Sequence, residues 1–130
     1  MLFLVLRTDK PEAEIGLFEG REKIAYELWE AHRQLAETLH AKIEQILHAA
    51  DKDWKDVAGI VVYEGPGSFT GLRIGIATAN AIAYGLHIPI VAAQTDHWAA
   101  KGIERLIAGE RDEIALPFYG QDAHITLPKK

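Results

Sequence analysis

The first thirty residues distribute their apolar side chains in the way that β-strands do. Residues 2–6 form an uninterrupted apolar run, which is typical of a strand buried on both faces. A second strand is predicted over 13–18, and a short hairpin connects it to a third strand over 23–29. Along the third strand the alternation favours three inward side chains: Ile24, Tyr26 and Leu28. The chain therefore opens as a three-stranded meander.

From residue 31 onward the apolar spacing changes to that of an amphipathic helix. Between residues 31 and 50 one stripe collects the apolar positions Leu35, Leu39, Ile43, Ile46, Leu47 and Ala50. The next predicted elements are a strand over 58–63, a helix over 72–84, a strand over 89–93 and a helix that ends near residue 107. Thr95 or Asp96 is the expected cap of that last helix. The order is β-β-β-α-β-α-β-α.

The pattern weakens after Gly109. Residues 114–119 and 124–127 are compatible with a short hairpin or with an extended tail. We therefore treat residues 1–130 as one lobe and residues 110–130 as its atypical tail.

The predicted helix over 72–84 has no polar side, because Arg73 is its one charged residue. Small residues recur every four positions on one side of it, at Gly71, Gly75, Ala79 and Ala83. A helix that is apolar all round has to be covered all round. The nearly bare row therefore predicts that another backbone approaches the helix closely.

Size and composition exclude several classes of protein. With 130 residues the chain has room for one modest core and not for two full lobes. It has no cysteine, which rules out disulfides, thiolate metal sites and cysteine nucleophiles. The formal net charge of −5 argues against a surface devoted to nucleic acid. No signal peptide or membrane span is predicted, so we expect a cytoplasmic protein.

A glycine-rich turn lies between the fourth strand and the following helix. Residues 65–75 are Gly-Pro-Gly-Ser-Phe-Thr-Gly-Leu-Arg-Ile-Gly, and this run resembles the signature of the TsaB (YeaZ) proteins. A weaker similarity extends from residue 1 to about residue 100. The turn itself is made of Gly65, Pro66, Gly67, Ser68, Phe69 and Thr70. The resemblance implies an α/β fold: a single actin-like (ASKHA, ribonuclease H-like) lobe with a mixed five-stranded sheet and no second lobe.

The resemblance also implies a function. TsaB proteins are partners of TsaD in making threonylcarbamoyladenosine in tRNA, so we expect a non-catalytic scaffold that activates a TsaD-type enzyme acting at position 37. A TsaE-type ATPase is an expected third member, and tRNA is expected to be met only through the complex. The chain alone could also form a homodimer. In the family the first two helices of each partner pack together, which implies an interface made of Gly71, Leu72, Gly75, Ile76, Ala79, Ile82, Ala83, Leu39 and Ile43.

The candidate catalytic residues argue against an enzyme. The loop after the first strand carries Arg7 where active members of the superfamily have an aspartate, and Asp9 is displaced by two residues. An arginine cannot bind Mg²⁺ or act as a base. Ser68 and Thr70 are more often turn or capping residues than nucleophiles. No catalytic residue is therefore assigned, although a degenerate ASKHA-type ATPase or kinase lobe and a self-sufficient homodimeric binding protein stay open as alternatives.

Cofactor and metal sites are also not expected. The glycine-rich turn could cradle a phosphate, but it lacks the lysine of a P-loop, which favours a purely structural tight turn. A nucleotide at a subunit interface of the complex stays open. His40, Glu44 and His48 share one helical face without further ligands, so a solvated face is the favoured interpretation. TsaD enzymes carry His-x-x-x-His, and no two histidines here are four apart, so the chain resembles the partner rather than the catalytic subunit.

Overall fold

The computed structural model describes residues 1–31, 34–112 and 115–116, and within them the elements follow the predicted order. The strands are β1 (Leu2–Arg7), β2 (Glu12–Glu19), β3 (Glu22–Glu30), β4 (Val57–Gly65) and β5 (Ile90–Gln94). The helices are α1 (Leu35–Ala49), α2 (Phe69–Leu86) and α3 (Trp98–Ile107), with a short 3₁₀ helix (Trp54–Asp56) before β4. The predicted tail segments over 114–119 and 124–127 fall largely outside the described residues.

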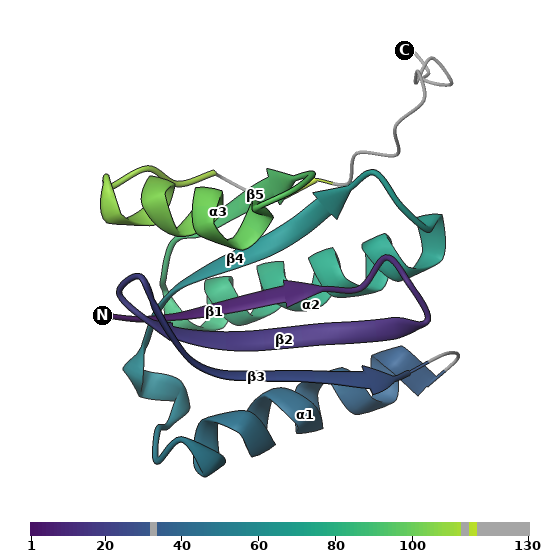
Figure 1. Ribbon diagram of the computed structural model, residues 1–130, viewed down its shortest axis with the longest axis horizontal. Helices are drawn as coiled ribbons and strands as arrows, with labels where there is room; N and C mark the ends of the chain where they lie inside the picture. The colour runs from purple at the N-terminus through teal and green to yellow at the C-terminus, as the bar shows by residue number, and fades with distance from the viewer. Residues whose placement is uncertain (32–33, 113–114, 117–130) are drawn as a thin grey trace.

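The five strands form one mixed sheet in the order β3-β2-β1-β4-β5 (Figure 1). The opening meander is antiparallel, whereas β4 runs parallel to β1 and β5 runs parallel to β4. The parallel pairs need crossover connections, and the helices α1 and α2 supply them. β1 is the central strand, and it is buried on both faces as its apolar run predicts.

Helices cover both faces of the sheet. Helices α1 and α2 lie side by side on one face, and α3 lies on the other face over β4 and β5 (Figure 1). The alternating side chains of β1 therefore enter two separate parts of the core. The side chains that are less than 2% exposed and largest in volume are Phe3, Leu4, Leu6, Ile15, Leu17, Leu39, Ile43, Leu47, Ile60, Leu72, Ile103 and Val5.

Two of the three inward side chains predicted for the third strand are wrong. Ile24 is 40% exposed and Leu28 is 49% exposed, whereas Trp29 faces α1 and donates a hydrogen bond from Nε1 to Thr38 Oγ1. Tyr26 does pack inward, over Gly16 of β2. The reason is that α3 packs mainly against β4 and β5 and leaves the second face of β3 largely uncovered.

The cap predicted for α3 is also wrong. Neither Thr95 nor Asp96 caps the helix; the N-cap position belongs to His97, which has a left-handed backbone conformation and makes no capping hydrogen bond through its side chain. Thr95 instead donates its hydroxyl hydrogen to the carbonyl of Gln94. The Thr95 hydroxyl therefore bonds within the turn that precedes the helix rather than to the first turn of α3.

Candidate functional site

The glycine-rich turn connects the end of β4 to the start of α2. Gly65 ends the strand with φ 129°, a value that side chains rarely adopt, and a cis peptide bond links it to Pro66. The Pro66 carbonyl accepts a hydrogen bond from the Tyr63 hydroxyl at 2.8 Å. Ser68 then precedes the first turn of α2 without a capping hydrogen bond from its side chain.

Two glycines of the signature allow α2 to lie directly against the end of β1. A Cβ atom at Gly71 would overlap the carbonyl oxygen of Thr8, and one at Gly75 would overlap the Thr8 side chain. Thr8 is 1% exposed, and its hydroxyl donates to the Gly71 carbonyl at 2.7 Å. The backbone that approaches the bare row of α2 is therefore the chain's own.

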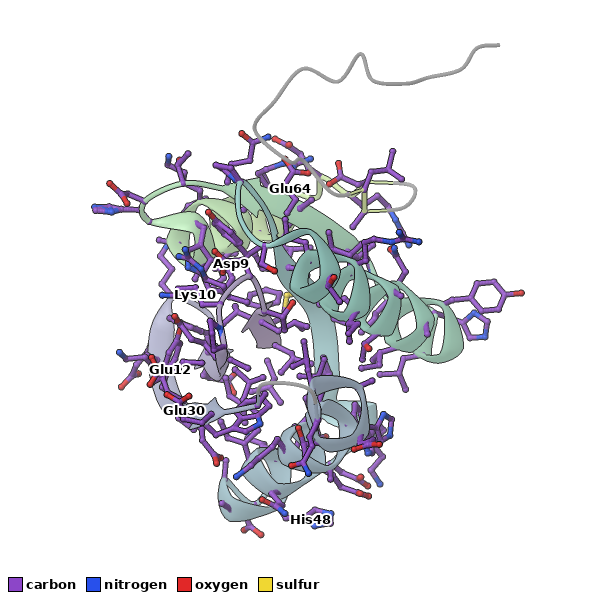
Figure 2. The ribbon with its side chains drawn as sticks, turned by 90° about the vertical axis from the view of Figure 1, so that its right-hand side faces the viewer. Asp9, Lys10, Glu12, Glu30, His48 and Glu64 are labelled. Atoms are coloured by element: carbon purple, nitrogen blue, oxygen red, sulfur yellow. The ribbon has the colours of Figure 1, made fainter. Side chains whose placement is uncertain are left out.

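Asp9 fixes the turn from the same side. A Cβ atom at Gly67 would overlap the Asp9 side chain, and the Ser68 amide donates to the Asp9 carbonyl at 3.1 Å. Figure 2 looks onto this end of the sheet, where Asp9 and Lys10 follow β1. The glycines at 67, 71 and 75 thus have one common explanation, which is contact with residues 8 and 9.

An ion pair joins the end of β1 to the same region. The Arg7 guanidinium donates from Nε to Asp9 Oδ1 at 2.7 Å and from Nη2 to Asp9 Oδ2 at 3.2 Å. It also lies 3.9 Å from the centre of the Tyr63 ring. The hydrogen bonds to Asp9 raise the pKa of Arg7 above its ordinary value, and burial raises the pKa of the Tyr63 hydroxyl. Both carboxylate oxygens of Asp9 are therefore engaged by a permanent cation.

A second polar cluster lies beside this ion pair. The Tyr26 hydroxyl donates to Glu14 Oε1 at 2.6 Å, and Lys10 Nζ lies 3.6 Å from Glu14 Oε2. Burial, reinforced by the hydrogen bond to Glu14, raises the pKa of Tyr26 far above its ordinary value. Tyr26 is consequently a neutral hydrogen-bond donor across the physiological pH range.

The structure also places the side chains that were considered as nucleophiles or as metal ligands. Ser68 and Thr70 are exposed, and together with Thr8 and Lys10 they help to line a hollow of about 240 Å³. Among the described residues no three His, Cys, Asp or Glu side chains are arranged to hold a metal ion. His40 stacks on Trp54 with ring centres 5.0 Å apart, and His48 lies exposed near the end of α1 (Figure 2).

The residues expected at a partner interface lie in the core of the lobe. Each apolar side chain of that set is at most 8% exposed: Leu72, Ile76, Ala79, Ile82, Ala83, Leu39 and Ile43. Of the two glycines, Gly75 is buried and Gly71 is half-buried. In the single chain this side of α2 faces β1, β4 and α1. A partner that meets α2 has to use its other side.

The outer side of α2 carries exposed residues with small or aromatic side chains. Ala77 and Ala81 are exposed, and Tyr84 is 83% exposed. Arg73 begins this strip at its N-terminal end. Beyond Tyr84 lies an open hollow of about 660 Å³ that is lined by Asn80, Ala81, Ala83, Tyr84, His87, Ile88, Ile90, Arg111 and Asp112.

Sequence reasoning overlooked two residues of this site. Thr8 and Tyr63 are not among the predicted site residues, yet both contact the glycine-rich turn or its flanking arginine. The signal for Thr8 was available in the four-residue spacing of Gly71 and Gly75, which demands a neighbour. Nothing in the sequence indicates which segment that neighbour belongs to.

The sheet order, the crossover helices and the glycine-rich turn define one lobe of the actin-like, ribonuclease H-like class. The family model described as TsaD, tRNA N6-adenosine threonylcarbamoyltransferase, matches residues 29–111. The chain therefore belongs to the family of the TsaD and TsaB (YeaZ) proteins.

Individual relatives carry both names. The chain is 39% identical over 117 residues to the tRNA N6-adenosine threonylcarbamoyltransferase of Geotalea uraniireducens, covering 88% of this chain and 33% of that protein. It is 29% identical over 147 residues to the threonylcarbamoyladenosine biosynthesis protein TsaB of Escherichia coli, covering 98% and 62% respectively. The solved structure of YeaZ from Pseudomonas aeruginosa superimposes with a TM-score of 0.67 at 26% identity, over 72% of this chain and 43% of that one.

These comparisons correct one expectation. A likeness to the partner subunit alone was too narrow, because a protein named as the transferase matches as well. The chain spans 33% and 62% of the two curated relatives above. The matched part is the lobe that the structure describes, and this lobe is common to proteins with either name.

Proposed function

We propose that this chain is a non-catalytic lobe that binds and activates a TsaD-type enzyme in the formation of threonylcarbamoyladenosine at position 37 of tRNA. Family membership and the names of its relatives support the pathway. The absence of a His-x-x-x-His pair from these 130 residues favours the partner's role over that of the transferase. The setting is the cytoplasm, where tRNA is modified.

The observation that carries the proposal is the exposed side of α2. Ala77 and Ala81 present little more than backbone to a neighbour, and Tyr84 offers a large exposed ring next to them. Aromatic anchors beside small residues are typical of protein interfaces. The proposed partner surface is therefore the outer side of α2 rather than the buried row.

The state of Asp9 supports a lobe without catalytic activity. Orientation of metal-bound phosphate requires a carboxylate with free oxygens. Here Arg7 engages both oxygens of Asp9, and the Arg7 guanidinium is itself stacked on Tyr63. Both Asp9 oxygens at the end of β1 are therefore already hydrogen-bonded to Arg7.

Further members of the complex follow from the same proposal. A TsaE-type ATPase joins the chain and its TsaD-type partner, and a nucleotide bound between subunits would belong to the assembly rather than to this lobe. The net charge of −5 favours contact with tRNA through the complex.

Two rival functions make different demands on the molecule. A degenerate ASKHA-type ATPase or kinase lobe would turn over ATP on its own. A self-sufficient homodimeric binding protein would pair through the outer side of α2 with a second copy, and would not need a TsaD-type protein.

A binding experiment separates these functions. The tagged chain is mixed with the TsaD-type protein of the same organism, and the complex is measured by size-exclusion chromatography with light scattering. We expect a heteromeric complex that Ala77→Arg weakens by at least about tenfold, because a charge is placed in the contact. Ala100→Arg, at an exposed position of α3 on the opposite face of the sheet, is the matched control and should bind normally. Failure to form any complex would contradict the proposal.

A further inference from the structure

The outer edge of β5 is an exposed edge of the sheet that needs protection. Among the described strands β5 pairs only with β4, so its other side is an edge. Residues 90–94 are Ile-Val-Ala-Ala-Gln and carry no charge. By contrast β3, at the opposite edge, carries Glu22, Lys23, Glu27 and Glu30. Charged residues discourage strand pairing between molecules, and β5 lacks this safeguard.

Several backbone groups along this edge are occupied, although no further strand lies there within the described residues. Asp112 makes one antiparallel bridge, in which its amide donates to the Ile90 carbonyl at 2.8 Å. Ala115 exchanges two hydrogen bonds with the side chain of Asn80, which belongs to α2. In the part of the chain that the structure describes, a single bridge therefore lies where a sixth strand would form a ladder.

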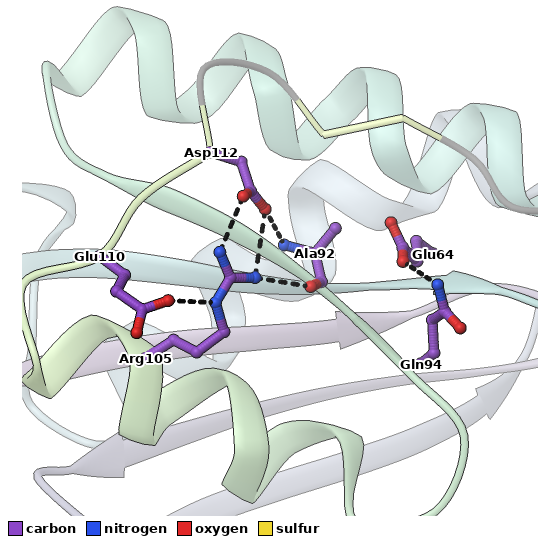
Figure 3. A network of polar contacts seen from close by, with 6 residues as sticks. All are labelled: Glu64, Ala92, Gln94, Arg105, Glu110 and Asp112. Carbon is purple, nitrogen blue, oxygen red and sulfur yellow. Dashed lines mark hydrogen bonds and ion pairs between the residues drawn. The ribbon is translucent and has the colours of Figure 1, made fainter.

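Side chains bond to further backbone groups of β5, at Ala92 and at Gln94. The Ala92 amide donates to Asp112 Oδ2 at 2.8 Å, and the Ala92 carbonyl accepts from Arg105 Nη1 at 3.2 Å (Figure 3). Arg105 Nη2 also donates to Asp112 Oδ1 at 2.8 Å, so the two side chains hold each other in place. The Gln94 carbonyl accepts from the Thr95 hydroxyl at 2.6 Å.

The electrostatics keep this arrangement charged at neutral pH. Burial tends to raise the pKa of Asp112, but the hydrogen bonds from Arg105 and from the Ala92 amide outweigh it and hold the pKa below its ordinary value. Hydrogen bonds to Asp112 and Glu110 raise the pKa of Arg105. Glu110 contacts Arg105 Nε at 2.9 Å, on the side away from β5 (Figure 3).

We propose that Asp112 and Arg105 act as a clasp that closes the edge of β5 in place of a sixth strand, and that opening the clasp lets β5 pair with β5 of a second copy. Two copies of one edge strand can pair antiparallel about a two-fold axis, because each presents the same donors and acceptors to the other. The short uncharged strand imposes no repulsion on such a pair. Asp112 also lines the hollow beside Tyr84, so the test has to suppress pairing through α2.

The test uses Asp112→Ala and Arg105→Gln, each combined with Ala77→Arg so that pairing through α2 is suppressed. Glu110→Ala in the same background is the matched control, because Glu110 touches Arg105 but not β5. Amide hydrogen exchange by NMR at low concentration reports the Ala92 N–H directly. We expect exchange at Ala92 to be at least about tenfold faster in Asp112→Ala than in the control, since a hydrogen bond to a charged group is lost.

Light scattering over a range of concentrations gives the second result. Both clasp variants should pass from monomer to dimer as concentration rises, with protection at Ala92 returning in the dimer, while the control stays monomeric. Arg105→Gln keeps Asp112 and therefore still tests the proposal if Asp112→Ala does not fold. Folded clasp variants that stay monomeric at every concentration would overturn the proposal, and so would an Ala92 amide that is as protected in Asp112→Ala as in the control.

Discussion

At the scale of single residues, the signature glycines matter because of what lies opposite them. Gly71 and Gly75 contact Thr8, whereas Gly85, in the last turn of the same helix, has no neighbour within 4 Å of a Cβ position. The same substitution should therefore have opposite effects at the two places. This contrast separates packing from helix propensity.

We expect Gly75→Ala to lower the free energy of unfolding by about 1–3 kcal/mol, because the added methyl group overlaps Thr8 in a tightly packed place. Gly71→Ala should cost at least as much, since the opposing atom belongs to the backbone. Gly85→Ala is the control and should raise the same quantity by up to about 1 kcal/mol through helix propensity. Urea titration followed by circular dichroism measures all three. A Gly75→Ala protein as stable as Gly85→Ala would refute the close contact.

Arg7 gives a second prediction at this scale. The purified chain should show no ATPase activity with Mg²⁺, because Asp9 is engaged by the Arg7 guanidinium. Phosphate release is measured against a buffer blank. Turnover well above the blank that Arg7→Ala abolishes, and that Arg21→Ala at an exposed ion pair leaves intact, would support the rival ATPase function instead.

At the scale of elements, α2 has two apolar sides with different roles. The side of Ala79 is buried against the sheet, and the side of Ala77 is exposed. The sequence shows that the helix is apolar all round but does not say which side faces the sheet. The absence of a polar side on the predicted helix therefore predicts that a partner covers it, but it does not show which side the partner meets.

Arginine substitutions on the two sides should behave differently. Ala79→Arg is expected to unfold the lobe, because an unpaired charge would be placed in the core at a cost of several kcal/mol. Ala77→Arg should keep the circular dichroism spectrum and melting temperature of the unsubstituted chain. A folded Ala79→Arg protein would mean that the buried row is available to a partner after all.

The same distinction explains how much of the fold was predictable. Element order and type follow from local periodicity, so the strands and helices lie close to their expected places. The orientation of β3 does not, because Ile24 and Leu28 are exposed only where α3 fails to reach. The contact between Thr8 and α2 joins residues 63 positions apart, and such pairing is decided by the assembled sheet.

At the scale of the whole molecule, one sheet supports both parts of the core. The side chains of β1 enter the core beneath α1 and α2 and the core beneath α3, so neither side can lose its packing alone. The structure describes no helix that is long and apolar enough to cross a membrane. Because both parts of the core share the side chains of β1, the lobe should unfold as one cooperative unit.

Two spectroscopic signals test this cooperativity. Trp98 packs against Tyr63 beneath α3, whereas Trp54 stacks on His40 of α1. Urea transitions followed by tryptophan fluorescence and by far-ultraviolet circular dichroism should coincide. Separate midpoints would show that the two sides of the sheet unfold independently.

The central claim is that a TsaD-type enzyme needs this lobe and meets it through the outer side of α2. The most direct measurement is incorporation of the threonylcarbamoyl group into tRNA by the TsaD-type enzyme of the same organism, with the other components of the reaction held constant. Incorporation should depend on adding the chain. When the Ala77→Arg variant replaces the unsubstituted chain, incorporation should fall to the level measured without the chain. The Ala100→Arg variant, used in the same way, should support as much incorporation as the unsubstituted chain. Equal modification of tRNA with and without the chain would contradict the account.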